Sequence, residues 1–341
     1  YPETTAQKVS GTLMADRNAI IDWFGRFLPV GFYYRAFYKP FGVWHWWERL
    51  IRVAAGLGVA NLASTPRYQD KQYLFCDVAV VGAGPAGLSA ALKAAEGGAS
   101  VLLIDEQPEL GGSLTYHRFA IDNQAVQSEA ETLIANVASH PRIRVLTQAL
   151  CNGWFTDHYL PVIQGDRLFK VRAKSCVLAT GSSEQHVVIR NNDLPGVVLC
   201  SALERLLNHY AVAPQGKLVV LAGNDQAWMT AFTAAEAGLS VAAVVDLRDA
   251  PDDAALLAEA NSRGMTVHTG ATVYTARRDA ESQSLCSVDI HRIDTEGEVG
   301  ELIAQHDCAV LAMSAGFMPA YQLACQAGAK LDYDDDRAVF T

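Results

Sequence analysis

From Cys76 onward, short apolar runs alternate along the chain with longer alanine-rich or polar segments. The first series of runs is DVAVVG, SVLLID, IRVLTQ and SCVLATG. A second series begins near Gly216 with KLVVLAG and continues through MTVHTGATVYTARR and SVDIHRI to CAVLAMSAG. Short apolar runs separated by helical segments are typical of buried parallel strands. The pattern predicts an α/β protein of the two-dinucleotide-binding flavoprotein type, with two tandem Rossmann-like domains and an aromatic N-terminal extension.

The same pattern divides the chain into four parts. We expect an N-terminal extension or interface arm at 1–74 and a first dinucleotide-binding domain at 75–210. A second, degenerate Rossmann-like domain follows at 211–312, and a truncated return segment at 313–341 continues the first domain. The chain opens at Tyr1 rather than Met and stops within a strand-like run, YDDDRAVFT. These ends predict an internal fragment of a longer polypeptide.

The N-terminal extension is rich in Trp, Tyr and Phe. A helix is expected over 44–55, because Trp47, Leu50, Ile51 and Ala54 share one face at helical spacing. Three interpretations of the aromatic residues stay open. They form a surface that packs on a partner protein, an arm that wraps the chain's own globular part, or a helix that lies on a membrane surface.

The stretch VVGAGPAGLSAAL contains a dinucleotide-binding motif directly after a predicted strand. Gly82 permits the tight turn, Gly84 lets a pyrophosphate approach the backbone, and Gly87 lets the following helix pack closely on the strand. Ala86 adds little bulk, and Pro85 suits the first turn of a helix. The helix N-terminus would face the phosphates with its N–H groups.

Further residues of the expected site follow the next predicted strand. Asp105 and Glu106 stand about 20 positions after the glycines, where a carboxylate accepts hydrogen bonds from ribose hydroxyls and disfavours a 2′-phosphate. In PELGGSL, Gly112 allows a close backbone approach and Ser113 could donate to a phosphate. Gly181 forms the turn after VLAT, on the adenosine side of the same ligand. FAD and NAD share the adenosine diphosphate, so these residues leave both open.

The second series departs from the motif. Of the three glycines only Gly223 is kept in VVLAGNDQAW, and Asp225 stands where a phosphate would need close backbone approach. Trp228 is expected to place a large ring near the start of the helix, while Asp246 and Arg248 end the next strand. Ordinary NAD(P)H binding at this second site is therefore disfavoured.

Composition and charge exclude several functions. The formal net charge of −10 over 341 residues argues against nucleic-acid binding. No bilayer-length apolar run or signal pattern is found, and few lysines accompany the aromatic residues of the N-terminal extension, so no membrane is expected as a partner. The seven cysteines have no C-x-x-C spacing, which argues against a metal site and a disulfide reductase and favours reduced thiols in the cytoplasm. His117 is interpreted as a surface histidine, and no residue has the spacing of a catalytic group.

Several stretches resemble the alpha subunit of heterotetrameric sarcosine oxidase and the large subunits of related amine and opine oxidoreductases. They are RFLPVGFYYRAFYKP with IRVAAGLG, the glycine motif through GGSL, RNNDLPGVVLCSALERLLNHYAVAPQGK and GNDQAW with AGLSVAAVVDLR. The resemblance runs from about Phe27 almost to the end of the chain. It implies contacts to a dinucleotide from seven residues: Gly82, Gly84, Ala86, Asp105, Glu106, Gln107 and Ser113.

The resemblance also implies a function. We expect a dinucleotide-binding large subunit of a complex that oxidises a secondary amine (an N-methyl amino acid) on the FAD of a beta-like partner subunit, with further small subunits. Electrons would pass between flavins to oxygen, with FMN at a subunit contact, and the one-carbon unit would pass to tetrahydrofolate in a C-terminal domain outside this chain. NAD is expected at the first site, with FAD as the alternative. Other functions left open are an FAD-containing large subunit of an amine, proline or opine dehydrogenase and a stand-alone FAD-dependent NAD(P)H oxidoreductase.

Overall fold

The computed structural model describes residues 11–12, 15–16, 40–54, 70–294, 297–335 and 339–341. The chain forms two compact units, 1–68 and 69–341. In the first unit, β1 (Gly11–Thr12) pairs antiparallel with β2 (Ala15–Asp16), and α2 spans Trp44–Ala54, which confirms the predicted helix. The aromatic stretch at 26–39 lies outside the described residues.

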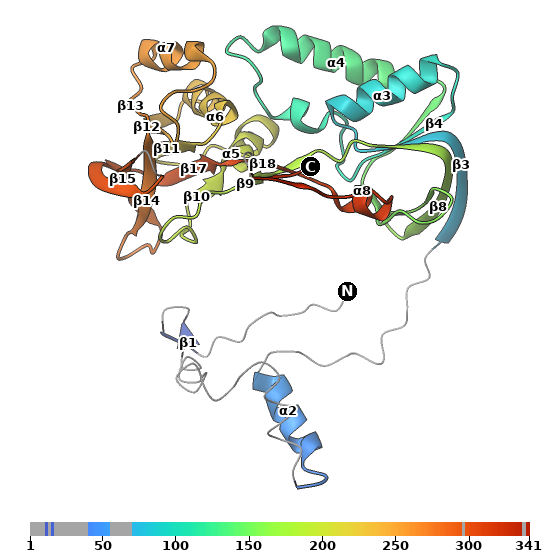
Figure 1. The fold of residues 1–341 in the computed structure, drawn as a ribbon, viewed down its shortest axis with the longest axis horizontal. Helices are drawn as coiled ribbons and strands as arrows, with labels where there is room; N and C mark the ends of the chain where they lie inside the picture. The colour runs from blue at the N-terminus through green and yellow to red at the C-terminus, as the bar shows by residue number, and fades with distance from the viewer. Residues whose placement is uncertain (1–10, 13–14, 17–39, 55–69, 295–296, 336–338) are drawn as a thin grey trace. The chain divides into compact units, whose positions relative to one another are not determined.

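The second unit begins with a six-stranded sheet in the order β5-β4-β3-β8-β7-β6. Its parallel part, β5-β4-β3-β8, carries α3 and α4 on one face, and their apolar side chains share a core with the strands (Figure 1). The antiparallel part joins β8 to β7 and β7 to β6. The bounds are β3 Asp70–Val81, α3 Pro85–Glu96, β4 Val101–Ile104, α4 Gln124–Ser139, β5 Ile143–Leu146, β6 Ala149–Cys151, β7 Tyr159–Gln164 and β8 Arg167–Leu178.

A second, five-stranded sheet has the order β10-β17-β11-β12-β13, and all its neighbouring strands run parallel. Trp228 and Phe232 are fully buried in α6, against the apolar side chains of β11 and β12. The bounds are β10 Val197–Leu199, α5 Cys200–Glu204, the π-helical turn η3 Arg205–His209, β11 Lys217–Ala222, α6 Asp225–Glu236, β12 Ser240–Asp246, α7 Ala254–Ser262, β13 Val267–His268 and β17 Val310–Ser314.

The other face of this sheet is covered by strands rather than helices. β14 (Ala271–Arg278), β15 (Leu285–Ile293) and β16 (Val299–Asp307) form an antiparallel three-stranded sheet. The interpretation of ATVYTARR and SVDIHRI as parallel strands was wrong. Only 279–284 connect β14 to β15, and a parallel pair needs a crossover of a dozen residues or more, so a short connection leaves the antiparallel arrangement.

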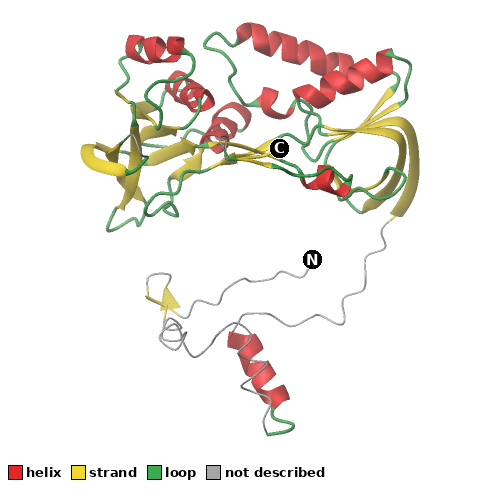
Figure 2. Cartoon of the chain, in the orientation of Figure 1, coloured by secondary structure: helices red, strands yellow, loops and turns green. Residues whose placement is uncertain are grey.

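The two sheets are linked by an antiparallel pair, β9 (Ser182–Gln185) with β18 (Gly316–Pro319). Figure 1 shows this pair between the sheets, and Figure 2 shows helices above the strands of both sheets in the same orientation. The remaining elements are the 3₁₀ turn η2 Gly112–Thr115, α8 Gln322–Gln326, β19 Tyr333–Asp334 and β20 Val339–Phe340. The β9–β18 pair brings the loop after β8 and the segment after β17 to the same region as the glycine loop.

Candidate dinucleotide site

The glycine loop between β3 and α3 shows why each glycine is needed. Gly82 has a φ of +100°, and a Cβ there would lie 2.1 Å from the carbonyl oxygen of Ala179. A Cβ on Gly87 would lie 1.8 Å from the carbonyl oxygen of Gly82. Gly84 differs, because a Cβ there would meet no atom within 4 Å. Gly82 and Gly87 thus permit the local packing, and only Gly84 faces open space.

Helix α3 begins at Pro85 with Gly84 as its N-cap, and no side chain caps this end. The backbone N–H groups of a first helical turn carry partial positive charge and attract an anion. Gly112 lies directly over the loop, since a Cβ on it would come within 2.9 Å of the Gly84 Cα. The N–H of Gly111 donates to the carbonyl of Ala83 at 2.9 Å, which holds the two glycine segments together. The result is a cradle made mostly of backbone.

Asp105 fixes the end of β4 against this cradle. Its Oδ2 accepts from the N–H of Ala83 at 2.5 Å and its Oδ1 from the N–H of Gln107 at 2.7 Å. The carboxylate is therefore held in place by the chain itself, without a ligand. Glu106, by contrast, is exposed to solvent.

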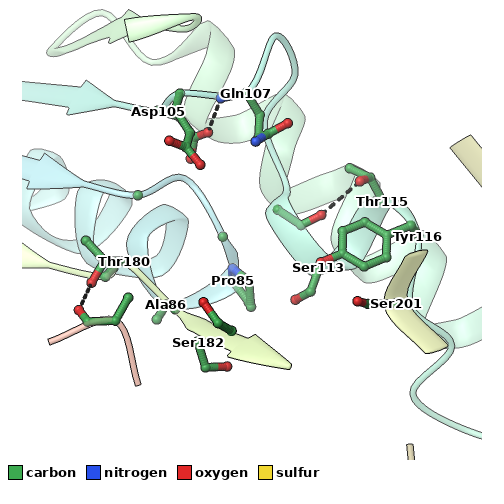
Figure 3. A pocket seen from close by; sticks show the side chains of 18 of the residues that line it. Pro85, Ala86, Asp105, Gln107, Ser113, Thr115, Tyr116, Thr180, Ser182 and Ser201 are labelled. Atoms are coloured by element: carbon green, nitrogen blue, oxygen red, sulfur yellow. Dashed lines mark hydrogen bonds between the residues drawn. The ribbon is translucent and has the colours of Figure 1, made fainter. Parts of the chain in front are cut away.

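A cavity of about 880 Å³ opens beside the cradle, and Figure 3 shows its polar lining. It is within the range of cofactor pockets. Gly87 does not line it and instead brings α3 close to the glycine turn. The other predicted site residues all line the cavity: Gly82, Gly84, Pro85, Ala86, Asp105, Glu106, Gln107, Gly112, Ser113 and Gly181.

The cavity continues to residues that sequence reasoning did not assign to the site. Phe317 comes from β18, Ser201 from α5 and Gln226 from α6, so the lining reaches the elements of the second sheet. In Figure 3, Tyr116 and Ser201 lie on the side of the pocket away from Asp105. No sequence motif marks these positions, since each belongs to a different element.

His117 is a correction to the sequence interpretation, because it is buried, with 8% of its surface exposed. Its Nδ1 is hydrogen-bonded to Glu204, which is fully buried on α5. Thr230 also donates to Glu204 Oε1, at 3.0 Å. Burial raises the pKa of Glu204, while its bonds to His117 and Thr230 act in the opposite direction. The pair links the cavity wall to the core beneath it.

The corresponding place in the second sheet is filled by the chain's own side chains. Arg248 donates to Asp225 at 2.8 Å and to Asp246 at 2.9 Å. Asp225 also accepts from the N–H groups of residues 252 and 253. Trp228 lies in the first turn of α6, where its ring is fully buried and its indole N–H donates to Asp246 at 2.6 Å. The hydrogen-bonding groups here are satisfied internally.

The described residues at the cavity give little support for thiol or metal chemistry. Cys151 is the cysteine in its lining, and burial raises the pKa of its thiol, which disfavours the reactive thiolate. All seven cysteines lie in the described part of the chain and are free. Within the described ranges, no group of three or more His, Cys, Asp or Glu side chains is placed to hold a metal ion.

Residues 76–340 match the family described as pyridine nucleotide-disulphide oxidoreductase. The chain belongs to this family. As in other pyridine nucleotide-disulphide oxidoreductases, its α/β fold is of the Rossmann-like kind that binds FAD or NAD. The structure is similar to that of thioredoxin reductase from T. acidophilum, with a TM-score of 0.59 and 19% identity, covering 76% of this chain and 83% of that one.

Among curated relatives, the sarcosine oxidase alpha subunit of Rhizobium meliloti (strain 1021) is 33% identical over 99% of this chain and 34% of that protein. The sarcosine oxidase alpha subunit of Corynebacterium sp. (strain P-1) is 36% identical over 84% of this chain and 31% of its own length. An opine oxidase subunit of Agrobacterium tumefaciens (strain Ach5) is 25% identical over 78% of this chain and 57% of its own length. The chain thus spans about a third of the length of these sarcosine oxidase subunits. No helix in the described ranges is long and apolar enough to cross a membrane.

Proposed function

We propose that this chain is the dinucleotide-binding part of the large subunit of a sarcosine-oxidase-like complex that oxidises a secondary amine. One contrast carries the proposal: the first glycine loop opens onto a cavity of about 880 Å³, while Asp225 and Arg248 fill the second site. A reductase that takes hydride from soluble NAD(P)H needs both places. Among the described residues, one open dinucleotide cradle and no reactive cysteine pair fit a subunit whose substrate chemistry lies elsewhere.

The residues present fit a dinucleotide. Gly84 leaves room for the pyrophosphate, the N-terminus of α3 attracts its charge, and Asp105 is held at the end of β4 where ribose hydroxyls would lie. We propose NAD at this site, with contacts from the residues named above, including Glu106, Gln107 and Ser113. When bound, a nicotinamide ring can accept a hydride. The role of this chain is to hold the dinucleotide in its backbone cradle.

The similarity to sarcosine oxidase alpha subunits supports a proposal for which subunit or domain carries each reaction step. In this proposal amine oxidation takes place on the FAD of a beta-like partner, and FMN lies at a subunit contact. Oxygen accepts the electrons, and tetrahydrofolate accepts the one-carbon unit in a separate domain. We also propose tandem dinucleotide-type domains at 75–210 and 211–312, with 313–341 returning to the first and 1–74 acting as an interface arm. One difference from these boundaries is that β10 and α5, expected in the first domain, join the second sheet and its core.

The test is to identify the small molecules released when purified protein is denatured, by mass spectrometry and absorbance. NAD in about one equivalent, with no flavin from the chain expressed without partners, supports the proposal. The similarity to the opine oxidase of Agrobacterium tumefaciens favours one alternative, a large subunit of an amine, proline or opine dehydrogenase that carries FAD itself. Stoichiometric FAD would select that alternative, and release of no dinucleotide would contradict both.

A further inference from the structure

The permanent positive charge of the cavity wall comes from one place, the π-helical turn η3. Among the described residues that line the cavity, Arg205 is the only Lys or Arg, and His209 comes from the same turn. The π-helix is rare and occurs mostly as a single turn, frequently at functional sites. The carboxylates of the lining belong to other segments, namely Asp105, Glu106 and Glu109 after β4 and Glu184 on β9. The cavity therefore offers an anion a single guanidinium, on an element other than the cradle.

The Arg205 side chain is held in position by a neighbouring tyrosine. Its guanidinium lies over the Tyr116 ring at 4.4 Å, and its Nη2 donates to the Tyr116 hydroxyl at 3.0 Å. The side-chain amide of Asn208, in the same turn, donates to the Tyr116 carbonyl at 2.7 Å. These contacts fix the turn against Tyr116. Stacking on a ring also restricts the guanidinium before a ligand arrives, which lowers the entropy lost on binding.

Arg205 lacks the carboxylate partner that other arginines of this chain have. Arg248 and Arg263, for example, each pair with carboxylates of neighbouring elements. Within the described ranges, the Arg205 side chain makes its one hydrogen bond to Tyr116 and has no carboxylate partner. Its other N–H groups are therefore available, and the side chain is exposed. An anion in the cavity that Arg205 lines can reach them.

We propose that Arg205 binds the carboxylate of a small organic acid at this end of the cavity. The planar guanidinium can donate a pair of parallel hydrogen bonds to a carboxylate, because Tyr116 takes only one of its N–H donors. The Ser201 hydroxyl and the His209 ring also line the cavity and make no hydrogen bond within the described part of the chain, so both are free to assist. Inorganic phosphate shares this chemistry, but one permanent cation suits the single charge of a carboxylate better than the larger charge of phosphate. The inference does not depend on which dinucleotide the cradle holds.

The test titrates acetate and N-methylglycine against the purified protein and follows broadening of their methyl proton NMR signals. Methyl acetate has the same acyl group without the carboxylate and serves as the matched probe. The wild type is expected to bind both carboxylates saturably and methyl acetate much more weakly. Because hydrogen bonds between charged groups are lost, Arg205→Gln should weaken carboxylate binding by roughly 10-fold or more. Arg205→Lys keeps the charge but not the planar pair of donors, so its loss should be smaller.

Arg144→Gln is the matched control. Arg144 is also exposed and lies over an aromatic ring, that of Phe169 at 5.9 Å, but it does not line the cavity, so this variant should bind like the wild type. If neither carboxylate binds the wild type, or if Arg205→Gln binds as well as Arg144→Gln, the inference is wrong. If inorganic phosphate binds through Arg205 and the carboxylates do not, the assignment to a carboxylate is wrong. Titration with ADP-ribose tests the cradle separately, so its failure would count against the proposed function alone.

Discussion

Replacing Gly84 with valine should strongly weaken dinucleotide binding while the fold stays intact. Gly84 has a φ of −72° and a ψ of −175°, which any residue can adopt, so a side chain causes no backbone strain. A Cβ there meets no atom within 4 Å, and the position lines the cavity. The added methyl groups would occupy the space through which a pyrophosphate approaches the helix N-terminus.

The size of the effect follows from the contacts at risk. A hydrogen bond between a backbone N–H and a charged phosphate contributes roughly 1.5–3 kcal/mol, so loss of a single one weakens binding by roughly 10- to 150-fold. The free energy of unfolding should change by less than about 1 kcal/mol, as for other substitutions that touch nothing. Titration with NAD and ADP-ribose measures the first quantity, and urea unfolding the second.

Two variants serve as controls for Gly84→Val. Gly300→Val places the same side chain on exposed β16, where a Cβ would lie 3.4 Å from the nearest atom, and should bind ligand normally. Gly87→Ala forces a Cβ to within 1.8 Å of a carbonyl oxygen and should lower stability as well as binding. Unchanged affinity of Gly84→Val for both ligands would refute the assignment of the cradle, and a stability loss as large as that of Gly87→Ala would refute the geometry.

Two further predictions concern the second sheet. Arg248→Ala leaves the fully buried Asp246 without its cation and should lower the free energy of unfolding by about 3 kcal/mol. Asp252→Ala removes only a partner that is 86% exposed and should cost less than about 1 kcal/mol, so equal losses in urea unfolding would contradict this assignment. Burial and the neighbouring His306 lower the pKa of His268, so protonation favours the unfolded chain. Stability should therefore fall as the pH drops below the ordinary histidine value of about 6.5, and unfolding of His268→Gln should show a flatter pH dependence.

The sequence was most informative where function depends on neighbours along the chain. The glycine spacing, the strand before it and the carboxylate after the next strand all lie within one β-α-β stretch, and the structure places them around one cavity. The positive φ of Gly82 and the packing of Gly87 against the Gly82 carbonyl are local, so the spacing predicts them, whereas the close approach of Ala179 to Gly82 is visible only in the folded chain. The antiparallel strands β14 and β15 were misread because the alternation of apolar residues does not reveal strand direction.

The pairing of His117 with Glu204 could not be predicted from sequence patterns. His117 and Glu204 are separated by 87 positions and meet only because α5 packs beside the segment after η2. The isolated His117 therefore resembled a surface residue. Likewise Asp225 was seen as an obstacle to phosphate, but its pairing with Arg248 was not foreseen, because the two are 23 positions apart on different elements.

Local sequence was enough to predict a Rossmann-like α/β fold, the conformation of the glycine loop after β3 and the loss of the glycines after β11, since these depend on periodicity and on backbone conformations that particular residues allow. Which side chains face the cavity beyond the loop, and which are satisfied internally, depended on the packing of the folded chain. Burial and hydrogen-bond partners are set by segments such as β9 and β18, which are distant in the chain and adjacent in space. For that reason Glu184 joins the cavity lining only when folding brings β9 beside β18.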